Sequence, residues 1–154
     1  MPIPKVKSYL ERAGVSYMTL DYSGAYSAQE VAAATHISGD QVVKTVMVKA
    51  DDVLLMAVVP ANKRVDLDRV KEATGAGQVS LADESDFGSL FKDCELGAMP
   101  PFGNLYGVEM LVDAGLADQD KIAFRAGTHS ELVRMAYKDY ARLVEPRVVA
   151  LAKV

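Results

Sequence analysis

Short apolar segments with helical spacing and with strand spacing follow one another along this chain. Residues 4–14 predict a helix, because a proline can occupy the first turn and a glycine can end the last one. A strand is expected at 15–20. A second helix is expected at 28–35, where Ser27 and Glu30 have the spacing of a capping box. The chain is therefore expected to begin with a helix, a strand and a helix.

The most apolar region consists of two β-branched runs, 42–48 and 53–59, which are separated by a short polar turn. Such runs predict a hairpin whose strands lie in the core. After the hairpin, a helix is expected to begin after an N-cap at Asp66 and to end at Gly75. A short strand is expected at 78–81.

The second half of the chain shows weaker versions of the same patterns. It is expected to contain a helix beginning near Asp83, strands at 110–112 and 122–124 joined by a polar turn at 113–120, and a last helix at 137–144. The stretch 128–135 fits both a capped helix and an alternating strand, and we expect a strand. Hairpins outnumber strand–helix–strand crossovers, which favours an α+β fold with a mixed, mostly antiparallel sheet.

Length and charge narrow the class of protein. A chain of 154 residues without linkers or repeats predicts one domain, residues 1–154. Its net charge of −4 argues against a protein that grips long DNA through the phosphates. Local positive charge at Lys63, Arg64, Arg69 and Lys71 is interpreted as a solvated face. No apolar run approaches the roughly 20 residues that span a bilayer, and no signal-like stretch follows the N-terminus, so a cytoplasmic protein without membrane contact is expected.

The segment 97–103, which reads Gly-Ala-Met-Pro-Pro-Phe-Gly, is the most unusual in the chain. Glycine permits a close approach to the main chain, and the prolines stiffen the loop and carry no N–H group. The remaining amides could donate to a carbonyl oxygen, as an oxyanion hole does. A rigid turn between two elements explains the composition equally well.

Lys44 and His129 are the other candidate residues. Lys44 interrupts an apolar run, so its ammonium either reaches solvent at a sheet edge or faces an anion or a polar cavity. His129 follows Gly127 and Thr128 in a loop-like setting, where a lone histidine more often has a structural role than a catalytic one. Cys94 is an unfavourable nucleophile because Asp93 and Glu95 would raise its pKa. The histidines and the cysteine have no ligand spacing, so neither a metal nor another cofactor is expected.

Together these three segments resemble the YbaK / prolyl-tRNA synthetase-associated domain family. The family's G-x-x-x-P loop is matched by residues 97–101, its K-T pair by Lys44 and Thr45, and its G-x-H setting by 127–129. The resemblance implies a barrel-like sheet surrounded by helices. It also implies catalytic roles for Lys44, Gly97, Ala98, Met99 and Pro101. The residues that it implies for substrate binding are Thr45, Pro100, Phe102, Gly103, Gly127, Thr128 and His129.

The activity implied by the resemblance is trans-acting hydrolysis of mischarged aminoacyl-tRNA, with a small amino acid that the tRNA for proline could carry. The loop would hold the substrate carbonyl and Lys44 the terminal adenosine. The implied partners are the acceptor end of the tRNA and an aminoacyl-tRNA synthetase on which the protein would ride. The alternative is a non-catalytic module that binds aminoacyl-tRNA or a nucleotide. Convergence of Lys44 and the loop amides on one cavity would favour hydrolysis, whereas a lysine turned elsewhere would favour binding.

Overall fold

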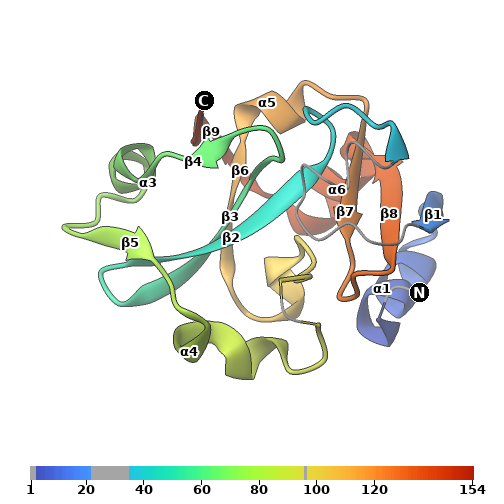
Figure 1. The fold of residues 1–154 in the computed structure, drawn as a ribbon, viewed down its shortest axis with the longest axis horizontal. Helices are drawn as coiled ribbons and strands as arrows, with labels where there is room; N and C mark the ends of the chain where they lie inside the picture. Colours follow the sequence, from blue (N-terminus) through green and yellow to red (C-terminus); the bar gives the residue numbers. More distant parts are fainter. Residues whose placement is uncertain (1–2, 22–34, 96) are drawn as a thin grey trace.

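The computed structural model describes residues 3–21, 35–95 and 97–154, so nearly all of the helix expected at 28–35 lies outside the described residues (Figure 1). The helices are α1 (Pro4–Ala13), α3 (Leu67–Thr74), α4 (Glu84–Phe87), α5 (Ala114–Ala117) and α6 (Tyr137–Val144), with 3₁₀ turns η1 (Gly88–Phe91) and η2 (Gly103–Leu105). The strands are β1 (Tyr17–Asp21), β2 (Val43–Ala50), β3 (Val53–Pro60), β4 (Arg64–Val65), β5 (Val79–Leu81), β6 (Glu109–Asp113), β7 (Lys121–Arg125), β8 (Glu131–Ala136), β9 (Arg147–Val149) and β10 (Ala152–Lys153).

These strands form open sheets that are mostly antiparallel. A five-stranded sheet has the order β5-β2-β3-β6-β9, a three-stranded sheet has the order β1-β8-β7, and β10 pairs with β4. The pairs β3–β6 and β6–β9 are parallel. A parallel bridge between Val42 and Ala123 joins the two larger sheets. The predicted α+β class with a mixed, mostly antiparallel sheet is confirmed, and the strands are divided among open sheets instead of closing one barrel.

The central hairpin consists of the two longest strands of the described residues, β2 and β3, with 8 residues each. Strands β2 and β3 pair from Val43–Pro60 to Ala50–Val53, which leaves Asp51 and Asp52 as a two-residue turn. Both turn residues have positive φ angles, 48° and 71°, as the tight turn of a twisted hairpin requires. The predicted hairpin is therefore confirmed.

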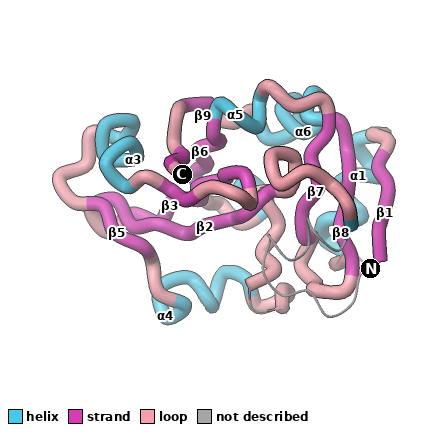
Figure 2. Tube along the Cα trace, turned by 45° about the horizontal axis from the view of Figure 1, so that its top comes forward, coloured by secondary structure: helices cyan, strands magenta, loops and turns pink. Residues whose placement is uncertain are grey.

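Apolar side chains cover both faces of the five-stranded sheet. On one face Val43 and Met47 belong to the same buried cluster as Phe102, Phe124 and Tyr140. On the other face Val48, Val59 and Leu111 pack with Val70 of α3 and Leu151. Figures 1 and 2 both show α3 and α4 on opposite sides of the β2–β3 hairpin. The sheet is thus a shared wall between two cores.

Local capping explains most helix boundaries. The carboxylate of Asp66 accepts the Asp68 amide at the start of α3, and Gly75 ends that helix in a left-handed conformation (φ 72°), as predicted. One difference lies in the predicted polar turn 113–120, which contains the short helix α5. The carboxylate of Asp113 accepts the Gly115 amide and so caps this helical turn.

Candidate functional site

Two of the three segments singled out in the sequence lie against each other. The loop 97–103 runs beside the turn that joins β7 to β8, and this turn contains residues 126–130. The Glu95 amide donates to the Gly127 carbonyl at 2.7 Å, and the Gly127 amide donates to the Ala98 carbonyl at 2.8 Å. These reciprocal bonds fix the two segments relative to each other. The segments are distant along the chain, since 28 positions separate Gly97 from Arg125, which also bond to each other.

His129 lies directly beside Gly97. A Cβ atom placed on Gly97 would be 3.6 Å from His129 Cε1, which is an ordinary contact distance. Gly97 has a φ angle of 80°, a conformation that favours glycine. The His129 amide donates to Glu95 Oε1 at 3.3 Å, and Arg125 Nη1 donates to the Gly97 carbonyl at 3.4 Å. The imidazole and the loop backbone therefore form one polar surface.

The amides of the loop differ in what they donate to. Three of them donate within the fold. The Ala98 amide donates to the Glu95 carbonyl at 3.0 Å and the Phe102 amide to the Pro100 carbonyl at 2.8 Å. The Gly103 amide donates to Met110 Sδ at 3.0 Å. In the described part of the chain, no hydrogen bond uses the amides of Gly97 and Met99. Of the five donors that the sequence left available, these two are the candidates for an external carbonyl oxygen.

The second half of the loop is anchored in the core. The Tyr140 hydroxyl donates to the Pro101 carbonyl at 2.6 Å. The Phe102 ring is fully buried and packs edge-on against the rings of Tyr9 and Phe124 at centroid distances of 5.8 and 5.4 Å. A Cβ atom on Gly103 would lie 2.5 Å from the Val108 carbonyl, so only glycine fits there. Pro101, Phe102 and Gly103, which were predicted as site residues, therefore anchor the loop in the core.

Gly127 is required for two reasons. Its φ angle is 96°, and a Cβ atom would lie 2.5 Å from Cγ2 of Ile3. The Ile3 amide in turn donates to the Ala126 carbonyl at 3.0 Å. The start of α1 therefore supports the β7–β8 turn from below the site. No sequence pattern indicates this contact, because Ile3 and Gly127 are far apart along the chain.

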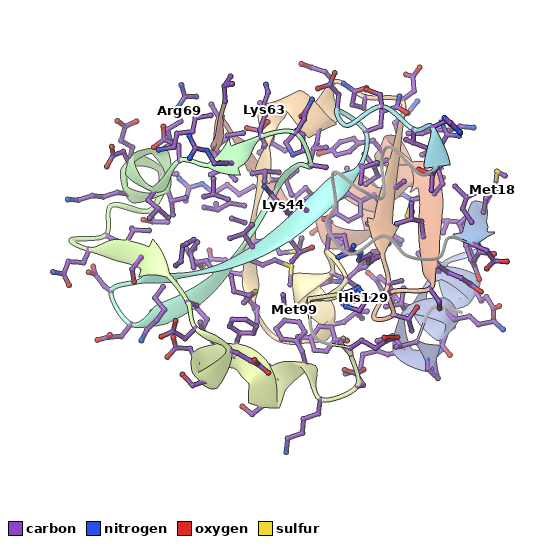
Figure 3. The ribbon with its side chains drawn as sticks, in the orientation of Figure 1. Met18, Lys44, Lys63, Arg69, Met99 and His129 are labelled. Carbon is purple, nitrogen blue, oxygen red and sulfur yellow. The ribbon has the colours of Figure 1, made fainter. Side chains whose placement is uncertain are left out.

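Lys44 lies on a different face of β2 from the loop. Alternation along a strand puts Lys44 with Val46 on the α3 side, and Thr45 with Met47 on the side of Phe102. The Lys44 ammonium donates to the Lys63 carbonyl at 2.6 Å. Burial, with Arg64 nearby, lowers the pKa of Lys44. In Figure 3 Lys44 lies apart from Met99 and His129, so the structure brings Thr45 to the loop's side of the strand and Lys44 to the opposite side.

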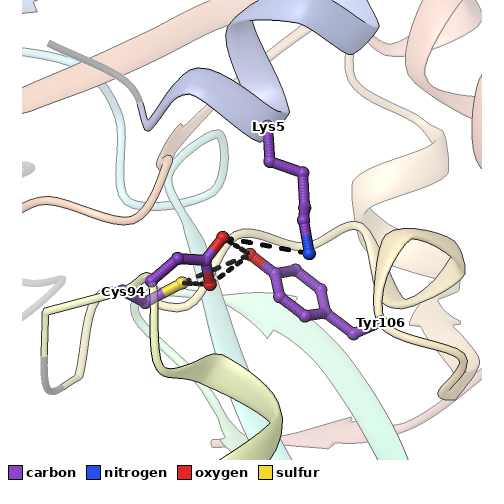
Figure 4. A network of polar contacts seen from close by, with 4 residues as sticks. Lys5, Cys94 and Tyr106 are labelled. Carbon is purple, nitrogen blue, oxygen red and sulfur yellow. Dashed lines mark hydrogen bonds and ion pairs between the residues drawn. The ribbon is translucent and has the colours of Figure 1, made fainter.

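Cys94 belongs to a polar cluster next to the loop (Figure 4). Its thiol lies 3.4 Å from the Tyr106 hydroxyl, which also donates to Asp93 at 3.2 Å, while Lys5 Nζ is 4.4 Å from the Tyr106 ring centroid. Burial, with a smaller contribution from Asp93, raises the pKa of Cys94 to about 11. The thiol is therefore protonated at neutral pH, as expected, although burial contributes more to the raised pKa than the acidic neighbour Asp93 does.

A cavity of about 180 Å³ opens between Cys94 and the loop, and Gly97, Met99, Phe87 and Phe91 contribute to its lining. It has room for a small group beside the Gly97 and Met99 amides. Among the described residues, no group of histidine, cysteine, aspartate or glutamate side chains could hold a metal ion. Within the same residues, no helix is both long and apolar enough to cross a bilayer.

Sequence patterns did not indicate Glu95, Arg125 and Tyr140 as parts of the site. Glu95 drew notice only as an acidic neighbour of Cys94, yet its carboxylate holds the His129 amide. Tyr140 lies on the apolar face of the last predicted helix, where nothing distinguishes it from a core residue. Their roles depend on contacts between segments that are distant in sequence.

Solved structures and curated proteins resemble this chain in different ways. The crystal structure of a protein provisionally described as a trans-editing enzyme for prolyl-tRNA synthetase superposes with a TM-score of 0.82 at 22% identity, covering 97% of this chain and 96% of that one. The structure of a hypothetical protein gives a TM-score of 0.86 at 22% identity, covering 97% and 99%. At these identities the likeness concerns the fold.

Relatives with higher identity are proline–tRNA ligases. The ligase of Bacillus cytotoxicus is 33% identical over 89 residues and that of Bacillus cereus 30% identical over 89 residues. Each match spans 58% of this chain and 16% of the ligase. The model of the aminoacyl-tRNA editing domain family matches residues 23–143, a stretch that includes Lys44, the loop 97–103 and His129. With that match over most of its length, the chain belongs to the aminoacyl-tRNA editing domain family.

Proposed function

We propose that this protein is an aminoacyl-tRNA deacylase that removes a small amino acid from a mischarged tRNA. The observation that carries the proposal is the pair of Gly97 and Met99 amides, which donate to no other described group and lie on a loop fixed beside His129. The family supports the reaction class. The proline–tRNA ligases among the relatives favour the tRNA for proline as substrate. We propose that the activity is cytoplasmic and acts in trans, with a synthetase as partner.

The chemistry requires no covalent intermediate on the protein. The aminoacyl ester is activated, and water or the neighbouring ribose hydroxyl can attack its carbonyl carbon. In the water reaction the ester C–O bond breaks, the water oxygen stays on the amino acid, and a proton passes to the ribose oxygen. The Gly97 and Met99 amides would stabilise the oxyanion, and one such donor typically contributes about 3 kcal/mol. Thr45, Thr128 and His129 would contact the substrate.

The cavity beside the loop would receive the amino-acid side chain. Its volume of about 180 Å³ suits a small side chain, and its lining combines the apolar Phe87, Phe91 and Met99 with charged groups such as Glu95. Discrimination by such a pocket is modest, because one methylene is worth only about 1–3 kcal/mol. Small amino acids are therefore the expected substrates.

A second candidate function is a non-catalytic module that binds aminoacyl-tRNA or a nucleotide. The position of Lys44 favours it, because the ammonium is bonded to the Lys63 carbonyl on the face of β2 opposite the loop. The expected contact of Lys44 with the terminal adenosine stays a prediction. The substrate would have to reach across the edge of β2, or the bond to Lys63 would have to break.

Single-turnover release of labelled amino acid separates the two functions. Alanine, serine, threonine and cysteine would each be tested on the tRNA for proline and on their own tRNAs. The native protein would be compared with Gly97→Ala and Lys44→Ala. Release by the native protein that Gly97→Ala reduces would support the deacylase. If the native protein releases amino acid from no substrate faster than buffer does, the deacylase is excluded and the binding module remains. A pull-down without a synthetase would contradict the proposed partner.

A further inference from the structure

The cavity beside the loop carries a surplus of negative charge. Its lining includes two carboxylates, those of Glu84 and Glu95, and one ammonium, that of Lys92. Among the described residues, none of these three side chains forms an ion pair. The thiol of Cys94, which also lines the cavity, has a pKa of about 11 and is uncharged at neutral pH. The lining therefore has more acceptors for a cation than its own lysine occupies.

Glu95 is held in one turn with the first of the two proposed oxyanion donors. Its amide donates to the Gly127 carbonyl at 2.7 Å, and its carbonyl accepts the Ala98 amide at 3.0 Å. The second bond closes a turn that begins at Glu95 and ends at Ala98. Gly97 has the φ angle of 80° that a type II turn requires at its third position. The main chain of Glu95 is thus fixed next to the Gly97 amide.

The carboxylate of Glu95 can accept further hydrogen bonds. Its Oε1 atom accepts the His129 amide at 3.3 Å, which is long for such a bond. Within residues 3–21, 35–95 and 97–154, no donor is bonded to Oε2. An ionised carboxylate has about four acceptor positions. Because the side chain is also exposed, it is accessible to a bound molecule that carries N–H donors.

An aminoacyl ester supplies a cation of this kind. Its α-ammonium group is attached to the carbon next to the carbonyl carbon. A carbonyl oxygen bonded to the Gly97 and Met99 amides therefore brings the ammonium into the same cavity. An ammonium group has three N–H donors and forms charge-assisted hydrogen bonds with a carboxylate.

The charge of Glu95 also affects the reaction. As water or a hydroxyl attacks, the carbonyl oxygen becomes negative, and an unpaired carboxylate nearby opposes this change. An α-ammonium bound to Glu95 would offset that repulsion. An ester without this ammonium would leave Glu95 unpaired beside the developing oxyanion.

We propose that Glu95 binds the α-ammonium group of the aminoacyl ester and makes the protein selective for esters of amino acids whose amino group is free. This assignment rests on the proposed function and adds a specificity-determining residue to it. A peptidyl-tRNA carries an acylated, uncharged nitrogen at this position, so it should be hydrolysed slowly. The volume of the cavity alone would not predict this rejection.

The test compares single-turnover hydrolysis of an aminoacyl-tRNA with that of its N-acetylated form. The amino acid is the one that the native protein releases fastest from the tRNA for proline. The native protein should hydrolyse the unacetylated ester about fivefold faster or more, since about 1 kcal/mol is the upper range for an exposed ion pair. Glu95→Gln keeps an oxygen for the His129 amide but has no charge. It should slow hydrolysis of the unacetylated ester only and so lose most of this preference.

Two further variants act as controls. Glu72→Gln removes an exposed glutamate of α3 that does not line the cavity, and it should keep the native preference. Glu84→Gln removes the other carboxylate of the lining. A preference lost in Glu84→Gln and kept in Glu95→Gln would overturn the assignment. Equal slowing of both esters by Glu95→Gln would also overturn it, because a merely structural role affects both. Circular dichroism would verify that the variants are folded.

A binding measurement distinguishes a failure of this assignment from a failure of the proposed function. The probe is an RNA hairpin ending in CCA whose terminal adenosine carries alanine through a stable amide bond, in unacetylated and N-acetylated forms. Calorimetry would measure the affinity of both forms for the native protein and Glu95→Gln. Weaker binding of the unacetylated form alone by Glu95→Gln would support the assignment even if no ester is hydrolysed. Equal affinity of the native protein for both forms, or no binding of either, would overturn it even if deacylation is observed.

Discussion

The Tyr140 hydroxyl donates a 2.6 Å hydrogen bond to the carbonyl of Pro101 inside the core. Tyr140 is fully buried, and burial raises the pKa of its hydroxyl well above the ordinary value, so it remains a donor at all physiological pH values. The bond joins α6 to the second proline of the loop. The loop is therefore positioned from its buried end, while Gly97 and Met99 lie at its accessible end.

Replacement of Tyr140 tests this anchor. Tyr140→Phe leaves the buried Pro101 carbonyl without its donor, so the free energy of unfolding should fall by about 1–3 kcal/mol, and deacylation should slow. Tyr137→Phe is the matched control, because the buried Tyr137 hydroxyl has no hydrogen-bond partner among the described residues. Denaturant unfolding and single-turnover release would be measured for both. Equal losses of stability in the two variants would contradict the anchor.

Gly97→Ala should separate catalysis from stability. Its positive φ makes alanine cost about 1–2 kcal/mol, and its Cβ would meet only the edge of His129. Gly75→Ala imposes the same backbone cost at a φ of 72°, with nothing within 4 Å of the added atom. Both variants should lose similar stability, whereas only Gly97→Ala should release amino acid at least about tenfold more slowly. Alanine keeps the N–H group at position 97, so a rate unaffected by Gly97→Ala would show that the reaction does not depend on the glycine conformation of this loop.

Asp113 should be important for folding. One of its carboxylate oxygens accepts the Leu151 and Ala152 amides at 2.8 and 3.0 Å, and the other accepts the Gly115 amide at 3.0 Å. Asp113→Ala removes all three bonds at a buried position, so a loss of about 3 kcal/mol or more is expected in denaturant unfolding. The exposed Asp118, at the other end of α5, is the control position. If Asp118→Ala proved as destabilising, the buried bonds of Asp113 would not explain the loss.

Asp51 should make stability depend on pH in the acidic range. Hydrogen bonds from the Gly77 amide, and then from the Gln78 amide, lower the pKa of this carboxyl. The unfolded-state pKa of aspartate is about 3.9. Because the folded-state pKa is lower, ionised Asp51 stabilises the folded protein at pH values above the unfolded-state pKa. This stability is lost as the pH falls through the folded-state pKa. Asp51→Asn should therefore lower the melting temperature at pH 7 and differ least from the native protein at the most acidic pH.

Asp52→Asn keeps the hairpin turn and serves as the comparison for Asp51→Asn. Asp52 also has a positive φ, 71°, which asparagine tolerates. Its melting temperature should follow that of the native protein across the acidic range. If the difference in melting temperature between the native protein and Asp51→Asn increased as the pH fell, a lowered pKa of Asp51 would be contradicted.

Cys94 should react slowly with iodoacetamide. With a pKa of about 11, about one thiol in a thousand is ionised at pH 8, and only the thiolate is the nucleophile. The alkylation rate should rise about tenfold per pH unit above neutrality, as followed by mass spectrometry, and should stay below that of glutathione at pH 8. Cys94→Ala should still hydrolyse aminoacyl-tRNA. Rapid alkylation at pH 7, together with an inactive Cys94→Ala, would restore the thiol as a candidate nucleophile.

The elements that the sequence predicted are those whose signals are local. The β2–β3 hairpin, the capped helix α3 and the last helix follow from turns, caps and periodicity within a few residues. The strands β4, β9 and β10 were not predicted, because they are two or three residues long and form only by pairing with distant segments. The resemblance grouped three segments into one site, and the fold brings two of them together, the loop 97–103 and the turn 126–130. Periodicity could not predict which of them meet.

Lys44 illustrates the limit most clearly. Residues 42–48 are apolar on both faces of the strand, so no alternation indicates which face meets the loop. The side of β2 that each residue occupies became clear only from the packing of Met47 with Phe102 and of Val48 with Val70. The lysine and the loop were therefore grouped by family resemblance, whereas the fold separates them with a strand.

Because β2 has a core on each side, its length between the Val42 bridge and the Asp51–Asp52 turn is constrained more tightly than its composition. Inserting or deleting one residue there would turn every following side chain to the other face. Lys44 and Thr45 would exchange surroundings, and both cores would lose their partners at once. Divergence of this protein should therefore have proceeded by substitution within β2, with changes in chain length confined to the loops.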